Sequence, residues 1–268
     1  MNQAYMEQLF SLEGQNAVVT GASSGIGRAI AVSLANMGAN VALLGRSKKG
    51  LALTRDQVQA NGGSCEEYIV DISDTDAQRD FFETWMESHK TIDIFVANAG
   101  VNIRSELPDA TLDDINEMVR TDYIGTLYGM ILCSDYMKRQ RSGNIVVITS
   151  INGVSPLPNQ AVYSSIKCAL ESAMQSLSVS MAEYGVRVNS IAPGCIRTAI
   201  NDHIFSVEEY RKGKEAEIPM GKIGTPEDIG DAVAAIVSDA FRFMTGNTVI
   251  VDGGELKRKK MKQPPLLS

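Results

Sequence analysis

The sequence predicts an α/β fold of a single domain, a doubly wound parallel sheet with helices on both faces. Short apolar runs alternate with segments of helical spacing from about residue 15 to residue 251, and the apolar runs are continuous along their length. Continuous apolar strands are typical of a sheet whose two faces are both covered by helices. The alternation of strand and helix favours parallel strands joined by crossover helices.

Each element can be assigned in order along the chain. The first apolar run feeds into glycines, and the first helix is expected to stop before Gly38, a residue suited to ending a helix. The long fourth helix is expected to be interrupted near Gly125. We expect strands at residues 15–20, 40–44, 66–70, 92–97, 144–149, 186–191 and 247–251, and helices at 28–37, 47–61, 75–90, 111–139, 161–184 and 226–238.

The whole chain, residues 1–268, is expected to form one domain. Residues 1–11 would be an N-terminal extension and residues 255–268 a C-terminal tail. The basic run at residues 257–260 is expected to be a solvated end of the chain, because short charge runs at termini usually are.

Composition and charge exclude several classes of protein. A net charge of −7 argues against a nucleic-acid or anionic membrane partner. No apolar run approaches the roughly 20 residues that span a bilayer, and residues 1–12 lack the order of a signal peptide. Four scattered cysteines and two histidines supply no recognisable metal-ligand set. We therefore expect a cytoplasmic protein without a metal.

A glycine-rich segment joins the first strand to the first helix and is the candidate phosphate-binding loop. Glycines permit positive φ and let a ligand approach where a Cβ would collide. The following helix start offers free N–H groups and the positive end of a dipole, which favours a pyrophosphate. The spacing Gly-x-x-x-Gly-x-Gly differs from the better-known Gly-x-Gly-x-x-Gly fingerprint. The candidate residues are Gly21, Ser23, Ser24, Gly25, Ile26 and Gly27.

The end of the second strand favours NADP over NAD. An acidic residue there would bind the adenosine ribose 2′-hydroxyl and repel a 2′-phosphate. This chain instead has Arg46, followed by Lys48 and Lys49. A guanidinium is well suited to forked contacts with phosphate, so Arg46 is the candidate partner of the 2′-phosphate.

Tyr163 and Lys167 are the candidate acid–base pair. They are four residues apart at the start of an expected helix, and positions four apart share one helical face. A lysine ammonium nearby stabilises the phenolate and makes the phenol more useful in proton transfer. Ser150 follows an expected strand, at the sheet edge where ligands of parallel sheets bind. Its hydroxyl could hold a substrate oxygen against the phenol.

With these residues in place, residues 12–254 resemble the short-chain dehydrogenase/reductase family, whose fold is of the Rossmann type. Ser150, Tyr163 and Lys167 match its catalytic serine, tyrosine and lysine. In the family this tyrosine and this lysine also contact the cofactor. The resemblance implies further cofactor contacts. These are Asp71 and Ile72 at the adenine, Asn98, Ala99 and Gly100 beside the cofactor, and Pro193, Gly194, Ile196 and Thr198 at the nicotinamide.

One position departs from the family pattern. The family usually completes a catalytic tetrad with an asparagine in the long middle helix, and the matching residue here is Asp122. In the family the main-chain carbonyl of that residue holds a water in a proton relay, so an aspartate could keep the role. An extra carboxylate near Lys167 could also change the pH optimum. Alternatively, the Asp122 side chain only satisfies backbone groups at a helix irregularity.

The resemblance implies an NADP(H)-dependent oxidoreductase that interconverts a secondary alcohol and a ketone. Residues 197–202 and 218–230 resemble the glucose dehydrogenase branch, and Asn102 and Asn152 near the expected site also favour a sugar or polyol. A hydroxysteroid or bile acid and a 3-oxoacyl thioester stay open as substrates. A non-catalytic NADP-sensing protein is the alternative of another class, and a Rossmann-type methyltransferase is a weaker one.

The resemblance also implies a variable substrate lid and an oligomer. The lid would cover residues 197–219. The two long helices at residues 111–139 and 161–184 would build a dimer or tetramer interface, with a homotetramer as the specific expectation. Met174 and Met181, at helical spacing, are expected in the core or at that interface.

Overall fold

A computed structural model describes residues 2–257 and contains one parallel sheet of seven strands. The strand order is β3-β2-β1-β4-β5-β6-β7, and every neighbouring pair is parallel. The strands are β1 (Asn16–Thr20), β2 (Asn40–Gly45), β3 (Ser64–Ile69), β4 (Ile94–Ala97), β5 (Gly143–Ile148), β6 (Val186–Pro193) and β7 (Thr248–Val251). The predicted doubly wound α/β fold is confirmed.

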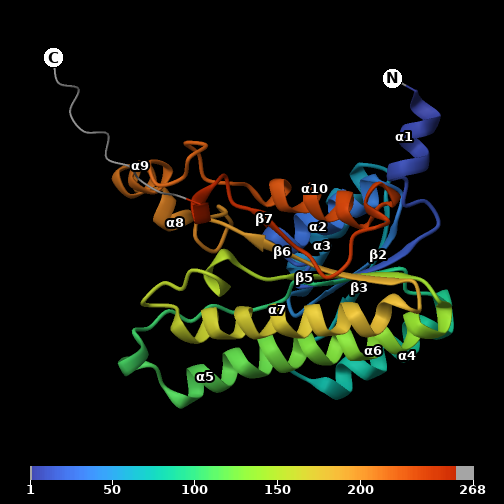
Figure 1. Cartoon of the computed structure of the whole chain (residues 1–268), viewed down its shortest axis with the longest axis horizontal. Coiled ribbons are helices and arrows are strands. Elements are labelled where there is room, and N and C mark those ends of the chain that lie inside the picture. The colour runs from blue at the N-terminus through green and yellow to red at the C-terminus, as the bar shows by residue number, and fades with distance from the viewer. Residues whose placement is uncertain (1, 258–268) are drawn as a thin grey trace.

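Helices cover both faces of this sheet (Figure 1). One face carries α2 (Gly25–Asn36), α3 (Lys48–Ala60) and α10 (Pro226–Val237), and the other carries α4 (Thr75–His89), α6 (Thr126–Gln140) and α7 (Ala161–Ala182). Consecutive strand residues point to opposite faces. Val19 therefore belongs to the core under α2 and α10, whereas Val18 packs on the other side with Phe95 and Trp85.

The topology places β1 in the interior of the sheet, between β2 and β4. The chain leaves β1 toward β2 on one side and later returns to β4 on the other. This reversal opens a crevice at the carboxyl ends of the strands, which is where ligands of doubly wound sheets bind. The glycine-rich segment at residues 21–27 lies directly after β1, at this crevice.

The long middle helix contains a π-helical segment, Val119–Gly125, between α5 (Leu112–Met118) and α6. The predicted interruption near Gly125 is thus confirmed. A Cβ at Gly125 would lie 2.4 Å from the Ile72 carbonyl oxygen, so the helix approaches that loop closely. π-Helical turns often occur at functional sites. This one carries Asp122.

Three helices were absent from the sequence-based assignment. α1 (Gln3–Phe10) lies within the expected N-terminal extension, is capped by the Asn2 side chain and buries no residue, so it has no core-facing pattern to detect. α8 (Asp202–Phe205) and α9 (Glu208–Glu215) lie within residues 197–219. There Phe205 packs against Ile218 and Ile223.

Other element boundaries differ from the predictions by a few residues. The first helix begins at Gly25 instead of residue 28, because the glycines themselves enter the first turn. β4 begins at Ile94 instead of residue 92.

Met174 and Met181 are buried in the core, as predicted. Short 3₁₀ turns occur at Leu107–Asp109, Ile151–Gly153, Asp239–Phe241 and Glu255–Lys257. Most of the expected tail, residues 258–268, lies outside the described residues. Within residues 2–257, no helix is both long and apolar enough to cross a bilayer.

Candidate active site

The glycine loop is packed so tightly that side chains are excluded from two of its positions. Gly21 has a φ of +68°, and a Cβ there would lie 2.8 Å from Ala99 Cα. A Cβ at Gly27 would lie 2.2 Å from the Gly21 carbonyl oxygen. Gly25 also has a positive φ, of +54°. These glycines are therefore required by the backbone path itself.

Polar contacts from the end of β4 hold the loop in place. The backbone N–H groups of Asn98 and Ala99 donate to Thr20 Oγ1 at 2.9 and 3.0 Å. Asn98 Nδ2 donates to the Thr20 carbonyl oxygen at 2.9 Å. The predicted segment Asn98–Gly100 thus ties β4 to the loop after β1. These contacts hold the glycine loop against the carboxyl end of β4.

The start of α2 has the features that a pyrophosphate requires. Ser24 occupies the N-cap position but its side chain makes no capping hydrogen bond. The N–H groups of the first turn, from Gly25 to Gly27, therefore have no side-chain acceptor within residues 2–257, and they lie at the positive end of the helix dipole. Thr198 comes close to this turn, with its Cγ2 3.4 Å from where a Gly25 Cβ would be. A dinucleotide fits this arrangement.

Arg46 and Asp71 lie together beyond the ends of β2 and β3. Arg46 Nη1 is 3.7 Å from Asp71 Oδ2, and 61% of the Arg46 side chain is exposed. Asp71 Oδ1 accepts from the backbone N–H and the hydroxyl of Ser73. Burial raises the pKa of Asp71, but the Ser73 donors and the Arg46 guanidinium outweigh it, and the net pKa is lowered. Ile72, the next residue in the chain, is buried.

The segment after β6 runs back toward the glycine loop. The Gly194 N–H donates to the Val251 carbonyl oxygen at 3.0 Å, and Ile196 forms a parallel bridge with Gly224. Asn201 then closes a small turn, accepting from the Thr198 N–H at 2.7 Å. Of the predicted residues Pro193–Thr198, Thr198 is thereby held beside the first turn of α2, close to Gly25.

Tyr163 and Lys167 lie together in the first turns of α7, which begins at Ala161 as predicted. Lys167 is 5% exposed, and its Nζ is 5.4 Å from the centroid of the Tyr163 ring. The ammonium donates to the Ile148 carbonyl oxygen at 3.1 Å, at the end of β5. A buried charge needs such partners, and this one holds α7 against the sheet edge.

Ser150 follows β5 by two residues and caps a short 3₁₀ turn. Its Oγ accepts from the Asn152 N–H at 3.1 Å. Because Lys167 binds the Ile148 carbonyl, both Lys167 and Ser150 are fixed to the same strand end. The structure thus brings the three predicted catalytic residues to one edge of the sheet.

Asp122 is fully buried in the π-helical segment beside Lys167. Its Oδ1 accepts from the Val101 N–H at 2.7 Å, and its Oδ2 is 3.9 Å from Lys167 Nζ. That Oδ2 has no hydrogen-bond partner among the described residues. Burial raises the pKa of Asp122, against the opposing effects of the Lys167 ammonium and the Val101 N–H. A Cβ at Gly100 would lie 2.9 Å from Oδ2, which explains the glycine there.

Glu171, one turn beyond Lys167, was not identified from the sequence. Its carboxylate accepts from the hydroxyls of Thr149 at 2.5 Å, Ser190 at 2.8 Å and Thr248 at 2.6 Å. Thr149 directly follows β5, Ser190 lies within β6, and Thr248 is the first residue of β7. The residue before Ser150 is thereby connected to α7. Only the i+4 spacing from Lys167 could have signalled this role.

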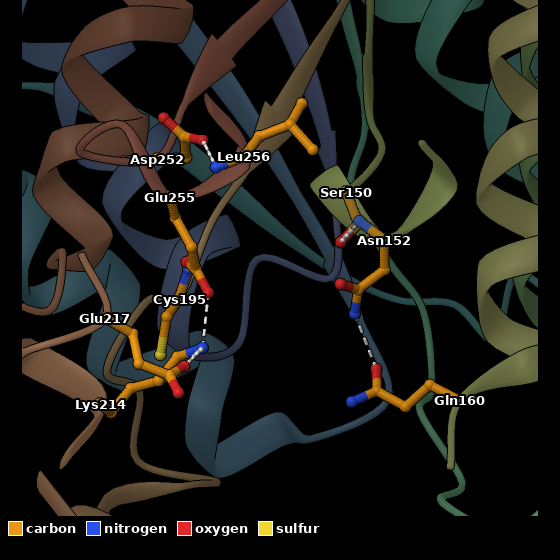
Figure 2. Close-up of polar contacts among 9 residues, drawn as sticks. All are labelled: Ser150, Asn152, Gln160, Cys195, Lys214, Glu217, Asp252, Glu255 and Leu256. Atoms are coloured by element: carbon orange, nitrogen blue, oxygen red, sulfur yellow. Dashed lines mark hydrogen bonds and ion pairs between the residues drawn. The ribbon is translucent and has the colours of Figure 1, made fainter. Parts of the chain in front are cut away.

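Gln160 was also missed, and it lies immediately before α7. It is 4% exposed, and its Oε1 accepts from the side-chain amides of Asn152 and Asn102, each at 3.0 Å. Figure 2 shows Ser150, Asn152 and Gln160 on one side of the space that separates them from Cys195, Lys214 and Glu255, and we call this space the gap. A glutamine three residues before a tyrosine carries no distinctive sequence signal.

The opposite wall in Figure 2 is built from the segment after β6, α9 and the C-terminal turn. Lys214 Nζ lies 2.5 Å from Glu255 Oε1 and 3.3 Å from Glu217 Oε2. Glu255 Oε2 also accepts from the Cys195 N–H at 2.8 Å. Burial raises the pKa of the Cys195 thiol to about 11, so the thiol is not poised to react. The ion pairs fix α9 to the end of the sheet.

The fold and the glycine loop at its centre define a nucleotide-binding α/β protein, and comparisons with known proteins identify its family. A family model described as enoyl-(acyl carrier protein) reductase matches residues 21–255. L-rhamnose 1-dehydrogenase (NAD(P)(+)) from Sphingomonas sp. (strain SKA58) is 32% identical, over 91% of this chain and 96% of that protein. 3β-Hydroxysteroid dehydrogenase 1 from Eggerthella lenta is 33% identical, over 91% of this chain and 94% of that protein.

A comparison with solved structures points to the same family. The crystal structure of a 3-oxoacyl (acyl-carrier-protein) reductase from Agrobacterium tumefaciens C58 with NADP bound has a TM-score of 0.89 and 31% identity, and the match covers 94% of this chain and 98% of that one. The chain therefore belongs to the short-chain dehydrogenase/reductase family. It is an oxidoreductase of that family, whose members use nicotinamide cofactors, and a non-catalytic NADP sensor is not supported.

Proposed function

We propose that this enzyme interconverts a secondary alcohol and a ketone with NADP(H). One observation carries the proposal: Lys167, the Tyr163 ring and Ser150 are assembled at the carboxyl end of β5, the edge of the parallel sheet at which the glycine loop follows β1. When bound, the nicotinamide supplies or accepts the hydride. The chain's own residues then have to hold the substrate oxygen and move one proton.

The proton is exchanged by Tyr163. Ser150 Oγ orients and polarises the substrate oxygen, and the Tyr163 hydroxyl donates the proton during reduction or accepts it during oxidation. The Lys167 ammonium lies 5.4 Å from the ring centroid, so a positive charge adjoins the side chain that exchanges the proton. The same ammonium is a donor for the nicotinamide ribose, so Tyr163 and Lys167 serve cofactor and substrate together.

Asp122 completes the arrangement as a relay position. Its carboxylate, 3.9 Å from Lys167 Nζ, lies where the family has an asparagine side chain. Asp122 lies in the π-helical segment Val119–Gly125, and π-helical turns often occur at functional sites, which supports a role of its main-chain carbonyl in holding a relay water. The side chain also satisfies the Val101 N–H. The two roles considered from the sequence are thus compatible.

NADP is preferred over NAD in this proposal. The exposed Arg46 guanidinium at the end of β2 is placed for a ribose 2′-phosphate, and no acidic residue replaces it at that strand end. Asp71, held by Ser73, is left to bind the adenine. Gly21–Gly27 hold the pyrophosphate, and Pro193–Thr198 with Asn98–Gly100 border the nicotinamide.

Residues 197–219, which include α8 and α9, act as a lid over the substrate in this proposal.

The enzyme is further proposed to be a cytoplasmic homo-oligomer, either a dimer or a tetramer. The outward faces of α6 and α7 support the interface, because they expose Ile131 (53%) and Val179 (80%). Apolar side chains exposed on adjacent long helices are typical of subunit contacts.

The favoured substrate is a sugar or polyol. Hydroxysteroids, including bile acids, and 3-oxoacyl thioesters are the alternatives. The names of the relatives given above indicate a sugar, a steroid and an oxoacyl substrate.

A panel of sugars, polyols, steroids and oxoacyl esters, assayed at 340 nm with NADP(H) and NAD(H), tests the proposal. We expect turnover of a hydroxyl-rich substrate and a preference for NADP(H). A clear NAD preference contradicts the assignment of Arg46, and no turnover contradicts the function.

A further inference from the structure

Three side-chain amides from separate segments meet beside Ser150. Asn102 follows β4, Asn152 lies in the 3₁₀ turn after β5, and Gln160 precedes α7. The Asn102 and Asn152 amides share one oxygen of Gln160, each at 3.0 Å. Gln160 is only 4% exposed, so its side chain is packed among its neighbours. The two hydrogen bonds join the three amides into one unit.

This unit leaves polar atoms available on the side of the gap. Among the described residues, Asn152 Oδ1 and Gln160 Nε2 make no hydrogen bond. Neither atom belongs to the buried side-chain atoms that lack a partner, so both are open to contact from the gap. Figure 2 shows both atoms pointing into the gap, in line with Ser150 Oγ. Polar atoms at the wall of a site are normally satisfied by what the site binds. A ligand in the gap therefore meets Ser150 Oγ, then Asn152, then Gln160.

We propose that Asn152 and Gln160 recognise a hydroxyl on the carbon next to the reacting carbon, so that the substrate is an α-hydroxy ketone or the corresponding vicinal diol. The inference rests on the proposed function, in which Ser150 and Tyr163 hold the reacting oxygen. The amide pair presents an acceptor beside a donor. A hydroxyl both donates and accepts, so a vicinal diol satisfies the pair.

The same pair selects against substrates that are apolar next to the reacting carbon. A ring ketone flanked by methylene groups would displace water from Asn152 Oδ1 and Gln160 Nε2 without replacing its hydrogen bonds. Sites built to bind a hydroxyl reject analogues that lack it, because the polar groups of the site are left unpaired. In the favoured reaction, hydride goes to the carbonyl carbon and a proton to its oxygen. NADPH, a proton and the hydroxy ketone give NADP⁺ and the diol.

The test uses two matched ketones, 2-hydroxycyclohexanone and cyclohexanone, with NADPH. The measured quantity is the ratio of their kcat/KM values. We expect wild type to prefer the hydroxy ketone by about tenfold or more, and Asn152→Leu to lose most of that preference. Comparing the ratio between enzymes cancels the different intrinsic reactivity of the two ketones. Gln160→Met is a second variant that removes the other polar atom, and it should also lower the ratio.

Asn159→Leu is the matched control, since this asparagine adjoins Gln160 but is exposed. It should keep the wild-type ratio. The inference is overturned if wild type shows no preference, or if Asn152→Leu and Gln160→Met, both folded and active, keep the ratio. Turnover of both ketones at equal efficiency would leave the proposed function intact. Turnover of neither ketone, nor of any carbonyl in the panel, contradicts the proposed function and this inference with it.

Discussion

The two halves of the crevice are built on different physical principles. On the cofactor side, the path of the backbone decides the geometry, and glycines at positions 21 and 27 stand where any Cβ would collide with main chain. On the proposed substrate side, polar side chains decide it, among them the buried Lys167 and Asp122 and the half-buried Glu171. The cofactor half should therefore respond to added volume, and the substrate half to lost hydrogen bonds and charge.

The largest expected effect is in the cofactor half. Gly27→Ala adds a methyl group 2.2 Å from the Gly21 carbonyl oxygen, so the loop must move away from the start of α2. We expect NADPH affinity to fall by roughly 100-fold or more in a fluorescence titration. Gly213→Ala in α9 is the control, because nothing lies within 4 Å of its added Cβ. Equal affinities in the two variants would contradict the volume argument.

The second effect belongs to the substrate half and concerns stability. Glu171→Leu leaves the hydroxyls of Thr149, Ser190 and Thr248 without their shared acceptor. We expect the free energy of unfolding to fall by about 2–4 kcal/mol, measured by urea denaturation. Glu117→Leu, an exposed residue of α5, should change it by less than about 0.5 kcal/mol. A loss no larger than that of the control would show that the carboxylate is not structural.

A third, smaller effect returns to the cofactor half. Arg46→Ala removes an exposed guanidinium placed for the 2′-phosphate. Charge-assisted contacts at an exposed site are partly screened, so we expect NADPH affinity to fall by about tenfold and NADH affinity to stay unchanged. NADH serves as the internal control, since it lacks the phosphate. A parallel loss for both cofactors would assign Arg46 a purely structural role.

The smallest effect is a pH dependence at Asp122. Its pKa is raised in the folded protein, so the folded state holds this proton more tightly than the unfolded chain does. Stability conferred by the protonated form is present below the ordinary carboxyl pKa and is lost as pH rises through the raised one. An asparagine side chain cannot ionise, so the Tm of Asp122→Asn minus that of wild type should rise across this window, by a few degrees at most. A difference that is constant or falls with pH opposes this reading.

The contrast between the halves also explains what the sequence could reveal. The glycine loop, the strand–helix alternation and the spacing from Tyr163 to Lys167 are local patterns, and each predicted element lies where expected within a few residues. Glu171 and Gln160 have partners 19 to 77 and 8 to 58 residues away, so no local pattern marks them. α1 was not predicted because it buries no residue and therefore shows no apolar pattern along the chain. Long-range polar contacts need the fold.

The central claim is that Tyr163 exchanges the substrate proton while Lys167 and Ser150 hold the reacting groups in place. The direct measurement is NADPH oxidation at 340 nm by wild type and Tyr163→Phe with the best substrate of the panel, combined with fluorescence titration of NADPH. We predict that kcat falls by roughly 100-fold or more in the variant while NADPH affinity stays within about threefold. Undiminished turnover by Tyr163→Phe would contradict the account.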